Sequence, residues 1–266
     1  MTPAPATSPA GDPTPDADGT SPEELPTSSA VTARATSGDL VLDVEVPRPA
    51  QPPGPGVDGN PGLLQIGTDD DGAAELTVVV ATDPALLVLT TPGTFAANAD
   101  GTVTVRGADG TPVGGLARPT AAPAGPADGT NGPATRARLV VTGPTRVEVT
   151  VDPADAAPSD TTGVPPVLVA TTLGTDALRT TSWGEREGGR SLAVDPTAWA
   201  RTGGAAAQEV LWAALVAVEP EADSDTMHDQ LVCHALGAPD KAAWNLEPWR
   251  PDVGLVATMA ARCNPT

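Results

Sequence analysis

Apolar and polar positions alternate along much of the chain between residues 31 and 192, as in β-strands with one buried face. In the run GDLVLDVEVP the apolar positions are Leu40, Leu42, Val44 and Val46. Further strands are expected over 63–66, 75–81, 85–90, 102–106, 138–141, 146–151 and 167–172, and loops over 47–61 and 120–133. Asp100-Gly101 and Asp109-Gly110 bracket a short strand, as turn dipeptides do in successive hairpins. Short strands with frequent turns predict an antiparallel, β-sandwich-like region.

The pattern becomes helical after Asp195. Asp195-Pro196 is a helix-start signal, with Asp as N-cap and Pro at the first helical position. Residues 205–218 are apolar nearly all round, so we expect a mostly buried helix there. The next helix is expected to begin at the caps Ser224 and Asp225 and to end at Gly237.

A last helix is expected to start near Asp252 and to carry Cys263. Together these patterns predict an α+β fold in three parts: a disordered Pro/Thr/Ala/Asp-rich tail over 1–30, a β-rich domain over 31–180, and a mostly helical C-terminal domain with one disulfide over 181–266. The tail contains no aromatic residue and only acidic charges, so it cannot bury enough surface to offset its ordering entropy.

Composition and charge exclude two classes of function. Asp and Glu outnumber Lys and Arg by 34 to 14, giving a net charge of −20. Binding to nucleic acid depends on neutralising phosphates with cations, so no nucleic-acid partner is expected. The longest apolar run, residues 210–218, is about half of a membrane span, so no transmembrane segment is expected.

Cysteine usage and the tail bear on the compartment. Residues 1–30 have no basic region followed by an apolar region, so no signal peptide is visible. Pro/Thr/Ser/Asp-rich stretches commonly follow a cleaved leader, however. Cys233 and Cys263 could close a loop of about 31 residues, contributing roughly 3–4 kcal/mol; the alternative is two reduced thiols. We expect a processed, exported protein in the extracellular space or the cell envelope.

The residues able to carry chemistry are concentrated in the last third of the chain. All five Trp, both His, both Cys and the only Lys follow residue 182. The β-rich region has a single aromatic residue, Phe95. Any functional site is therefore expected in the C-terminal domain.

Two segments of this domain, SWGEREGGRSLAVDPTAWAR at 182–201 and residues 226–266, resemble a family of exported actinobacterial proteins known only as a domain of unknown function. The resemblance rests on Gln-x-x-Cys-His at 230–234, Lys-x-x-Trp-Asn-Leu-Glu-Pro-Trp-Arg-Pro at 241–251 and Cys-Asn-Pro at 263–265. It covers roughly residues 180–266. It implies export and a disulfide, and it brings no established activity.

His234 is the first candidate for a functional role. On a helical projection it lies beside Gln230, at the edge of the apolar side of its helix. The two could face a cleft, with His234 as a general acid or base, or they could simply order a loop. A hydrolase would pair His234 with Glu247 or Asp229. His228 projects into the apolar side and is expected to be a satisfied core histidine.

The segment 241–251 is the second candidate. Pro248 and Pro251 restrict its backbone, so its side chains are expected to be held rigidly. Indoles and a guanidinium on a rigid loop could bind a sugar or an anionic group. Alternatively, the indoles fill the helical core and Glu247 pairs with a cation. The ligand-binding candidates are Gln230, Lys241, Trp244, Asn245, Trp249 and Arg250.

No metal or cofactor is expected. His228 and His234 are six residues apart and do not share a helix face, which argues against zinc. The run Asp69-Asp70-Asp71-Gly72 lacks the ligand spacing of a calcium loop and is expected to be a solvated turn. The sequence contains no Gly-x-Ser-x-Gly elbow and no Gly-rich phosphate loop.

Three classes of function follow, and the sequence leaves open whether the protein is an enzyme. The first, which we favour, is an envelope or extracellular binding module with a cleft for a small polar or glycan-type ligand. The second is a secreted hydrolase using His234 with Glu247 or Asp229. The third is a structural or host-facing protein with no small-molecule site. The sequence carries no signal for oligomeric state.

Overall fold

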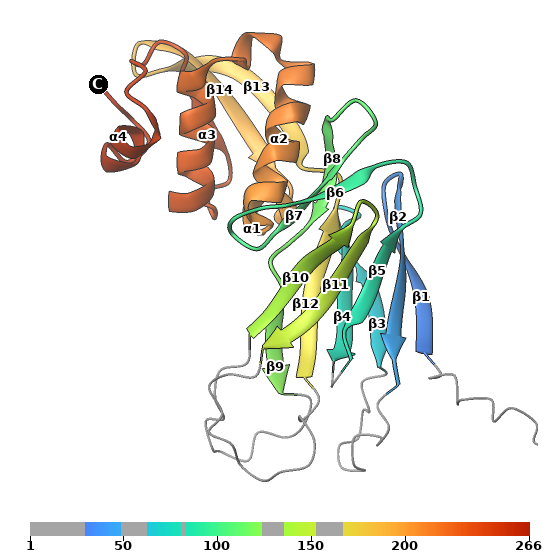
Figure 1. Ribbon diagram of the computed structural model, residues 1–266. Coiled ribbons are helices and arrows are strands. Elements are labelled where there is room, and N and C mark those ends of the chain that lie inside the picture. The colour runs from blue at the N-terminus through green and yellow to red at the C-terminus, as the bar shows by residue number, and fades with distance from the viewer. Residues whose placement is uncertain (1–29, 49–62, 81–82, 124–135, 153–166) are drawn as a thin grey trace, which may run out of the picture.

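The computed structural model (Figure 1) describes residues 30–48, 63–80, 83–123, 136–152 and 167–266. The tail expected over 1–30 lies outside this part of the chain, apart from Ala30. The strands are β1 (Ala30–Ser37), β2 (Leu40–Pro47), β3 (Leu64–Thr68), β4 (Ala74–Val80), β5 (Ala85–Leu89), β6 (Thr94–Ala97), β7 (Val103–Arg106), β8 (Pro112–Leu116), β9 (Thr120–Pro123), β10 (Arg136–Gly143), β11 (Arg146–Asp152), β12 (Val167–Gly174), β13 (Leu178–Arg186), β14 (Gly189–Pro196) and β15 (Trp244–Leu246). The helices are α1 (Ala198–Thr202), α2 (Gly204–Val218), the 3-10 turn η1 (Pro220–Ala222), α3 (Asp225–Gly237) and α4 (Leu255–Ala260).

Two antiparallel sheets form the N-terminal part of the molecule. One has five strands in the order β1-β2-β5-β11-β10; the other has seven, in the order β3-β4-β12-β8-β7-β6 with β9 pairing with β12. Their facing sides share one hydrophobic core, which includes Leu42, Leu87, Val147, Leu76, Val105 and Val169. The arrangement is sandwich-like, and we call residues 30–174 the β-sandwich region.

Residues 178–266, the C-terminal region, combine the helices with a third sheet of order β13-β14-β15. Figure 1 shows the helices gathered at one end of the β-sandwich region, with α4 and the C-terminus at the outer edge of this group. A second hydrophobic core holds this region together, including Trp199, Leu211, Leu231 and Trp244. None of the helices in the described ranges is long and apolar enough to cross a membrane.

Every strand expected from the alternation pattern is present, as β2, β3, β4, β5, β7, β10, β11 and β12. One expectation was wrong: residues 120–123 form β9 instead of a loop, because their backbone pairs with β12 from Thr120 to Pro123. The C-terminal region holds α1 to α4 together with a small sheet that none of the expected strands covers. In this sheet β13 and β14 form a hairpin around Glu187 and Gly188, both with positive φ, and β15 pairs with β14. The chain is therefore mostly β-sheet, with few helices and one disulfide.

Two helix boundaries also differ from expectation. Asp195-Pro196 ends β14 instead of starting a helix, and the N-cap of α1 is Thr197, whose Oγ1 accepts a hydrogen bond from the Ala200 N–H. The last helix, α4, ends at Ala260, so Cys263 lies beyond it. Arg262 and Cys263 both have left-handed backbone conformations, with φ of 54° and 68°, which do not continue a helix.

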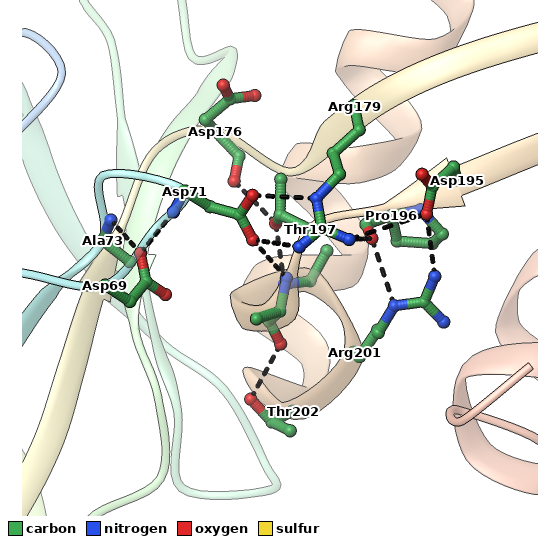
Figure 2. Close-up of polar contacts among 12 residues, drawn as sticks. Asp69, Asp71, Ala73, Asp176, Arg179, Asp195, Pro196, Thr197, Arg201 and Thr202 are labelled. Carbon is green, nitrogen blue, oxygen red and sulfur yellow. Dashed lines mark hydrogen bonds and ion pairs between the residues drawn. The ribbon is translucent and has the colours of Figure 1, made fainter. Parts of the chain in front are cut away.

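An acidic turn of the β-sandwich region anchors the C-terminal region (Figure 2). The Asp71 carboxylate accepts two hydrogen bonds from Arg179, of 2.8 and 2.6 Å, and one of 2.8 Å from the Ala198 N–H at the start of α1. The hydrogen bonds from Arg179 hold the pKa of Asp71 below its ordinary value. The expectation of a solvated turn was therefore wrong for Asp71, whose side chain is only 13% exposed.

A second turn of the β-sandwich region caps α2. The Ala205 N–H donates to the Asp100 carboxylate at 2.8 Å, and the Ala206 N–H donates to Thr102 Oγ1 at 3.2 Å. Burial acts to raise the pKa of Asp100, but the hydrogen bonds from the Ala205 N–H and from Thr102 outweigh it and hold the pKa below its ordinary value. The N-terminal ends of α1 and α2 are thus both held by carboxylates of the β-sandwich region.

Candidate functional site

The motif at 241–251 begins as an edge strand. β15 pairs with β14 so that Trp244 lies opposite Val194 and Leu246 opposite Leu192. This register turns Trp244 and Leu246 into the core, where both are fully buried. Trp244 stacks on the His234 ring, with 6.4 Å between ring centroids. The Trp244 indole is therefore part of the core and does not face a ligand.

Gln230 joins α3 to the same motif. Its Nε2 donates to the backbone carbonyls of Thr226 and Glu247, at 3.2 and 3.0 Å, and its Oε1 accepts from the Glu247 N–H at 2.9 Å. The side-chain amide thus provides both the donor and the acceptor that a neighbouring strand would offer to Glu247. Gln230 is fully buried, and these bonds satisfy its polar atoms.

Arg250 connects three separate segments through its guanidinium. It donates to the Glu247 carboxylate, to the Glu187 carboxylate at 2.7 Å and to the Pro265 carbonyl at 3.1 Å. Burial acts to lower the pKa of Arg250, but the two carboxylates outweigh burial and raise it. Arg250 and Glu247 are both buried. The contacts of Arg250 tie the β13–β14 turn and the C-terminus to the motif.

Trp249 is the one indole of the motif that reaches solvent, with 44% of its surface exposed. The Arg250 guanidinium lies over its ring at 4.5 Å from the centroid. The ring also lies so close to Gly189 that a Cβ atom at that position would overlap it. These contacts hold the Trp249 ring in one orientation against the hairpin.

His234 is buried and does not meet either proposed catalytic partner. Its Nε2 lies 3.1 Å from the Asn245 carbonyl. Burial, reinforced by the charge of Lys241, lowers the pKa of His234 to about 4, despite the opposing hydrogen bond to Asn245. Within the described structure no hydrogen bond joins it to Glu247 or Asp229. The hydrolase hypothesis requires an accessible His234 in contact with a carboxylate, and this geometry does not provide one.

The remaining predicted residues lie at the edges of this cluster. Lys241 is exposed, and Asn245 and Asp229 are half-buried. The disulfide joins Cys233 in α3 to Cys263, with Cα atoms 5.6 Å apart. It fastens the end of the chain beside the Arg250 contacts. No group of three or more His, Cys, Asp or Glu residues suited to a metal ion occurs in the described ranges.

An open hollow lies on the other side of α3, between α2, α3 and the β7–β8 hairpin. Its volume is about 330 Å³. We call it the Trp212 hollow, and its lining residues are Arg106, Pro112, Ala205, Gln208, Glu209, Trp212, Ala213, His228 and Val232. Arg106 and Glu209 form an ion pair of 2.7 Å at its edge.

The expectation that His228 is a core histidine was wrong. The residue is exposed and packs edge-on against Trp212, with ring centroids 4.8 Å apart. Sequence reasoning missed this hollow, although the apolar pattern of α2 was one indication of it. Residues 205–218 are apolar on nearly every side, yet only one side of α2 is buried in the core. The buried residues of that side are Ala206, Ala207, Val210, Leu211 and Leu215.

Comparison with known proteins places the similarity in the C-terminal region. Residues 178–266 match the family described as "Protein of unknown function (DUF2599)". Uncharacterized proteins of Mycobacterium tuberculosis and Mycobacterium bovis are each 40% identical over 93 residues, which is 32% of this chain and 63% of theirs. One from Mycobacterium leprae is 36% identical over 81 residues, covering 29% of this chain and 60% of its own.

The chain thus spans less than two thirds of the length of these relatives. No solved structure matches it. The expected resemblance to a domain of unknown function is confirmed for residues 178–266.

Proposed function

We propose that the protein is an exported binding module of the cell envelope or extracellular space, and that it holds a small polar or glycan-type ligand in the Trp212 hollow. The observation that carries the proposal is the composition of this hollow. An indole, an imidazole, an amide and an ion pair surround one open space of about 330 Å³. Ligand sites in proteins commonly combine an apolar floor with a few converging polar groups, in roughly this range of volumes.

The chemistry of the hollow suits a sugar. An indole offers a flat apolar surface on which the C–H face of a pyranose can lie. Gln208 and His228 supply donors and acceptors for hydroxyl groups, and the Arg106–Glu209 pair supplies one group of each charge. This mixture favours a neutral polyhydroxyl ligand over a strongly charged one.

The proposed ligand site is therefore the Trp212 hollow and not the motif at 241–251. There Trp244, Gln230, Glu247 and Arg250 are buried, and contacts within the C-terminal region occupy them. We assign this cluster the role of a rigid support behind α3, whose other side carries His228. Export is supported by the Cys233–Cys263 disulfide, since such bonds persist mainly in oxidising compartments.

A structural or host-facing protein with no small-molecule site is the second candidate. The observation that favours it is the burial of Gln230, Glu247 and Arg250, whose hydrogen bonds are made within the C-terminal region. The two candidates differ in what they predict for the Trp212 hollow, because only a binding module requires it to take up a ligand.

The test is calorimetric titration of the whole chain with a panel of neutral hexose and pentose oligosaccharides. We expect at least one to bind, and Trp212→Phe to weaken its binding by about tenfold or more, the size of effect expected for losing a central indole contact. Trp249→Phe is the matched control, because it removes an exposed indole outside the hollow and is expected to leave the affinity unchanged. Absence of binding throughout the panel would favour the structural alternative.

A further inference from the structure

A second open site lies in the β-sandwich region, between the edges of its two sheets. Its volume is about 550 Å³. We call it the Arg118 groove, and its lining residues are Ala99, Gly101, Arg118, Pro119, Ala121, Arg136, Ala137, Arg138 and Leu139. We infer that the Arg118 groove binds a small anionic sugar, one that carries a phosphate or a carboxylate group.

The topology of the sandwich forms this groove. β10 is the outer strand of its sheet, and within the described residues β9 pairs only with β12. The groove therefore runs between two sheet edges. Arg136 and Arg138, two positions apart on β10, reach it from one sheet, and Arg118, which follows β8, reaches it from the other.

The charge of the groove is opposite to that of the whole molecule. The net charge of the chain is −20, with only 14 basic residues, and three of these line this one groove. Arg138 is paired with Asp152 at 2.5 Å. Arg118 and Arg136 form no ion pair with any residue in the described part of the chain, although acidic residues outnumber basic ones 34 to 14. Among the described residues that line this space, two arginines have no ion-pair partner and none is acidic, which suits an external anion.

The rest of the lining narrows the class of ligand. A guanidinium binds carboxylate and phosphate groups through two parallel hydrogen bonds, which a lysine cannot reproduce. The floor is made of small aliphatic side chains, and no aromatic ring is present on which a nucleobase could stack. A volume of about 550 Å³ fits a small molecule and not a folded partner. An anionic sugar combines these features: one or two oxyanions for the arginines and an apolar ring face for the floor.

This inference does not rest on the proposed function, because the groove and the Trp212 hollow share no lining residue. The test uses the whole chain at low ionic strength and titrates it with glucose 6-phosphate, glucuronic acid and glucose. We expect one or both of the charged sugars to bind, and glucose to bind more weakly. The charged sugar that binds identifies the anionic group, and added salt should weaken its binding.

The variant Arg118→Gln/Arg136→Gln should weaken binding of the charged sugar by about tenfold or more, as expected for the loss of hydrogen bonds to a charged group. The double variant Arg48→Gln/Arg146→Gln removes the same charge from exposed positions outside the groove and should retain the wild-type affinity. All four side chains are exposed, so folding should be preserved and can be checked by the melting temperature. Equal affinity of the two double variants would overturn the inference, as would binding of neither charged sugar above glucose.

Discussion

Arg250 and His234 show how single side chains in the C-terminal region are matched to buried positions. A buried guanidinium is tolerated only when its charge and its N–H groups are both satisfied. Arg250 meets this requirement with two carboxylates and a backbone carbonyl. Glu247 and Arg250 are thus paired internally, in agreement with one of the two interpretations of the sequence, whereas Lys241 is exposed.

His234 is buried as the neutral imidazole. Its Nε2 meets the Asn245 carbonyl, and its Nδ1 has no hydrogen-bond partner among the described residues. Its pKa of about 4 in the folded protein lies below the ordinary value of 6.5, so the unfolded chain binds the proton first as the pH falls. The free energy of unfolding should therefore decrease from about pH 6.5 towards about pH 4, and be unaffected by this group above that window. The full difference corresponds to about 3 kcal/mol, at about 1.4 kcal/mol per pKa unit.

The prediction is tested with His234→Gln, which removes the buried imidazole. Between about pH 7 and about pH 4.5, the wild-type free energy of unfolding should fall by about 2–3 kcal/mol more than that of the variant, measured by urea unfolding. The control is His228→Gln, because His228 is exposed, and it should keep the wild-type behaviour. Parallel pH profiles for wild type and His234→Gln would show that this burial has no energetic consequence.

At the scale of elements, helix ends of the C-terminal region depend on the β-sandwich region. α1 begins at a backbone N–H bound to Asp71, and α2 begins at one bound to Asp100. A carboxylate at a helix start provides a partner for a backbone N–H group that the helix leaves unbonded, and it complements the positive end of the helix dipole. The two regions are therefore expected to support each other's stability.

Replacing Asp71 by Asn tests this coupling. Asn keeps an acceptor for the Ala198 N–H but loses the charge paired with Arg179. We expect a loss of about 1–2 kcal/mol in the free energy of unfolding, below the usual range for a charged hydrogen bond because Arg179 is 40% exposed. Asp70→Asn is the matched control, since Asp70 is the exposed neighbour in the same turn. Equal stability of the two variants would contradict the coupling.

What the sequence predicted well at this scale is local. Alternation identified the strands it was applied to, and the Ser224 cap and Gly237 located α3, where Ser224 Oγ accepts from the Met227 N–H. Apart from the two helix boundaries, the errors concern pairings between distant residues. β15 is a strand only because β14 lies beside it, about 50 residues earlier, and Asp71 is bound by a residue 108 positions away. No periodicity in a short window carries such information.

The candidate site shows the same division. The sequence located the cluster of rare residues and the two cysteines that pair. It did not show which side of α3 would be open, because that depends on where the β7–β8 hairpin and α2 pack. His228 was consequently assigned to the core, although it lines the Trp212 hollow.

At the scale of the whole molecule, buried and open sites are separated. The buried cluster around Arg250 lies next to the disulfide and the C-terminus. The Trp212 hollow lies where the helices meet the β-sandwich region, with lining residues from both. We propose that the buried cluster provides rigidity and that the Trp212 hollow takes up the ligand.

The most direct test is the two-dimensional NMR spectrum of the side-chain indole N–H groups, recorded with and without a bound oligosaccharide. The chain has five tryptophans, and each signal can be assigned from a single Trp→Phe variant. We expect the Trp212 signal to move on binding, while those of the buried Trp199 and Trp244 stay in place. The proposed ligand site would be contradicted if the Trp212 signal stayed in place on binding, whether or not another indole signal moved.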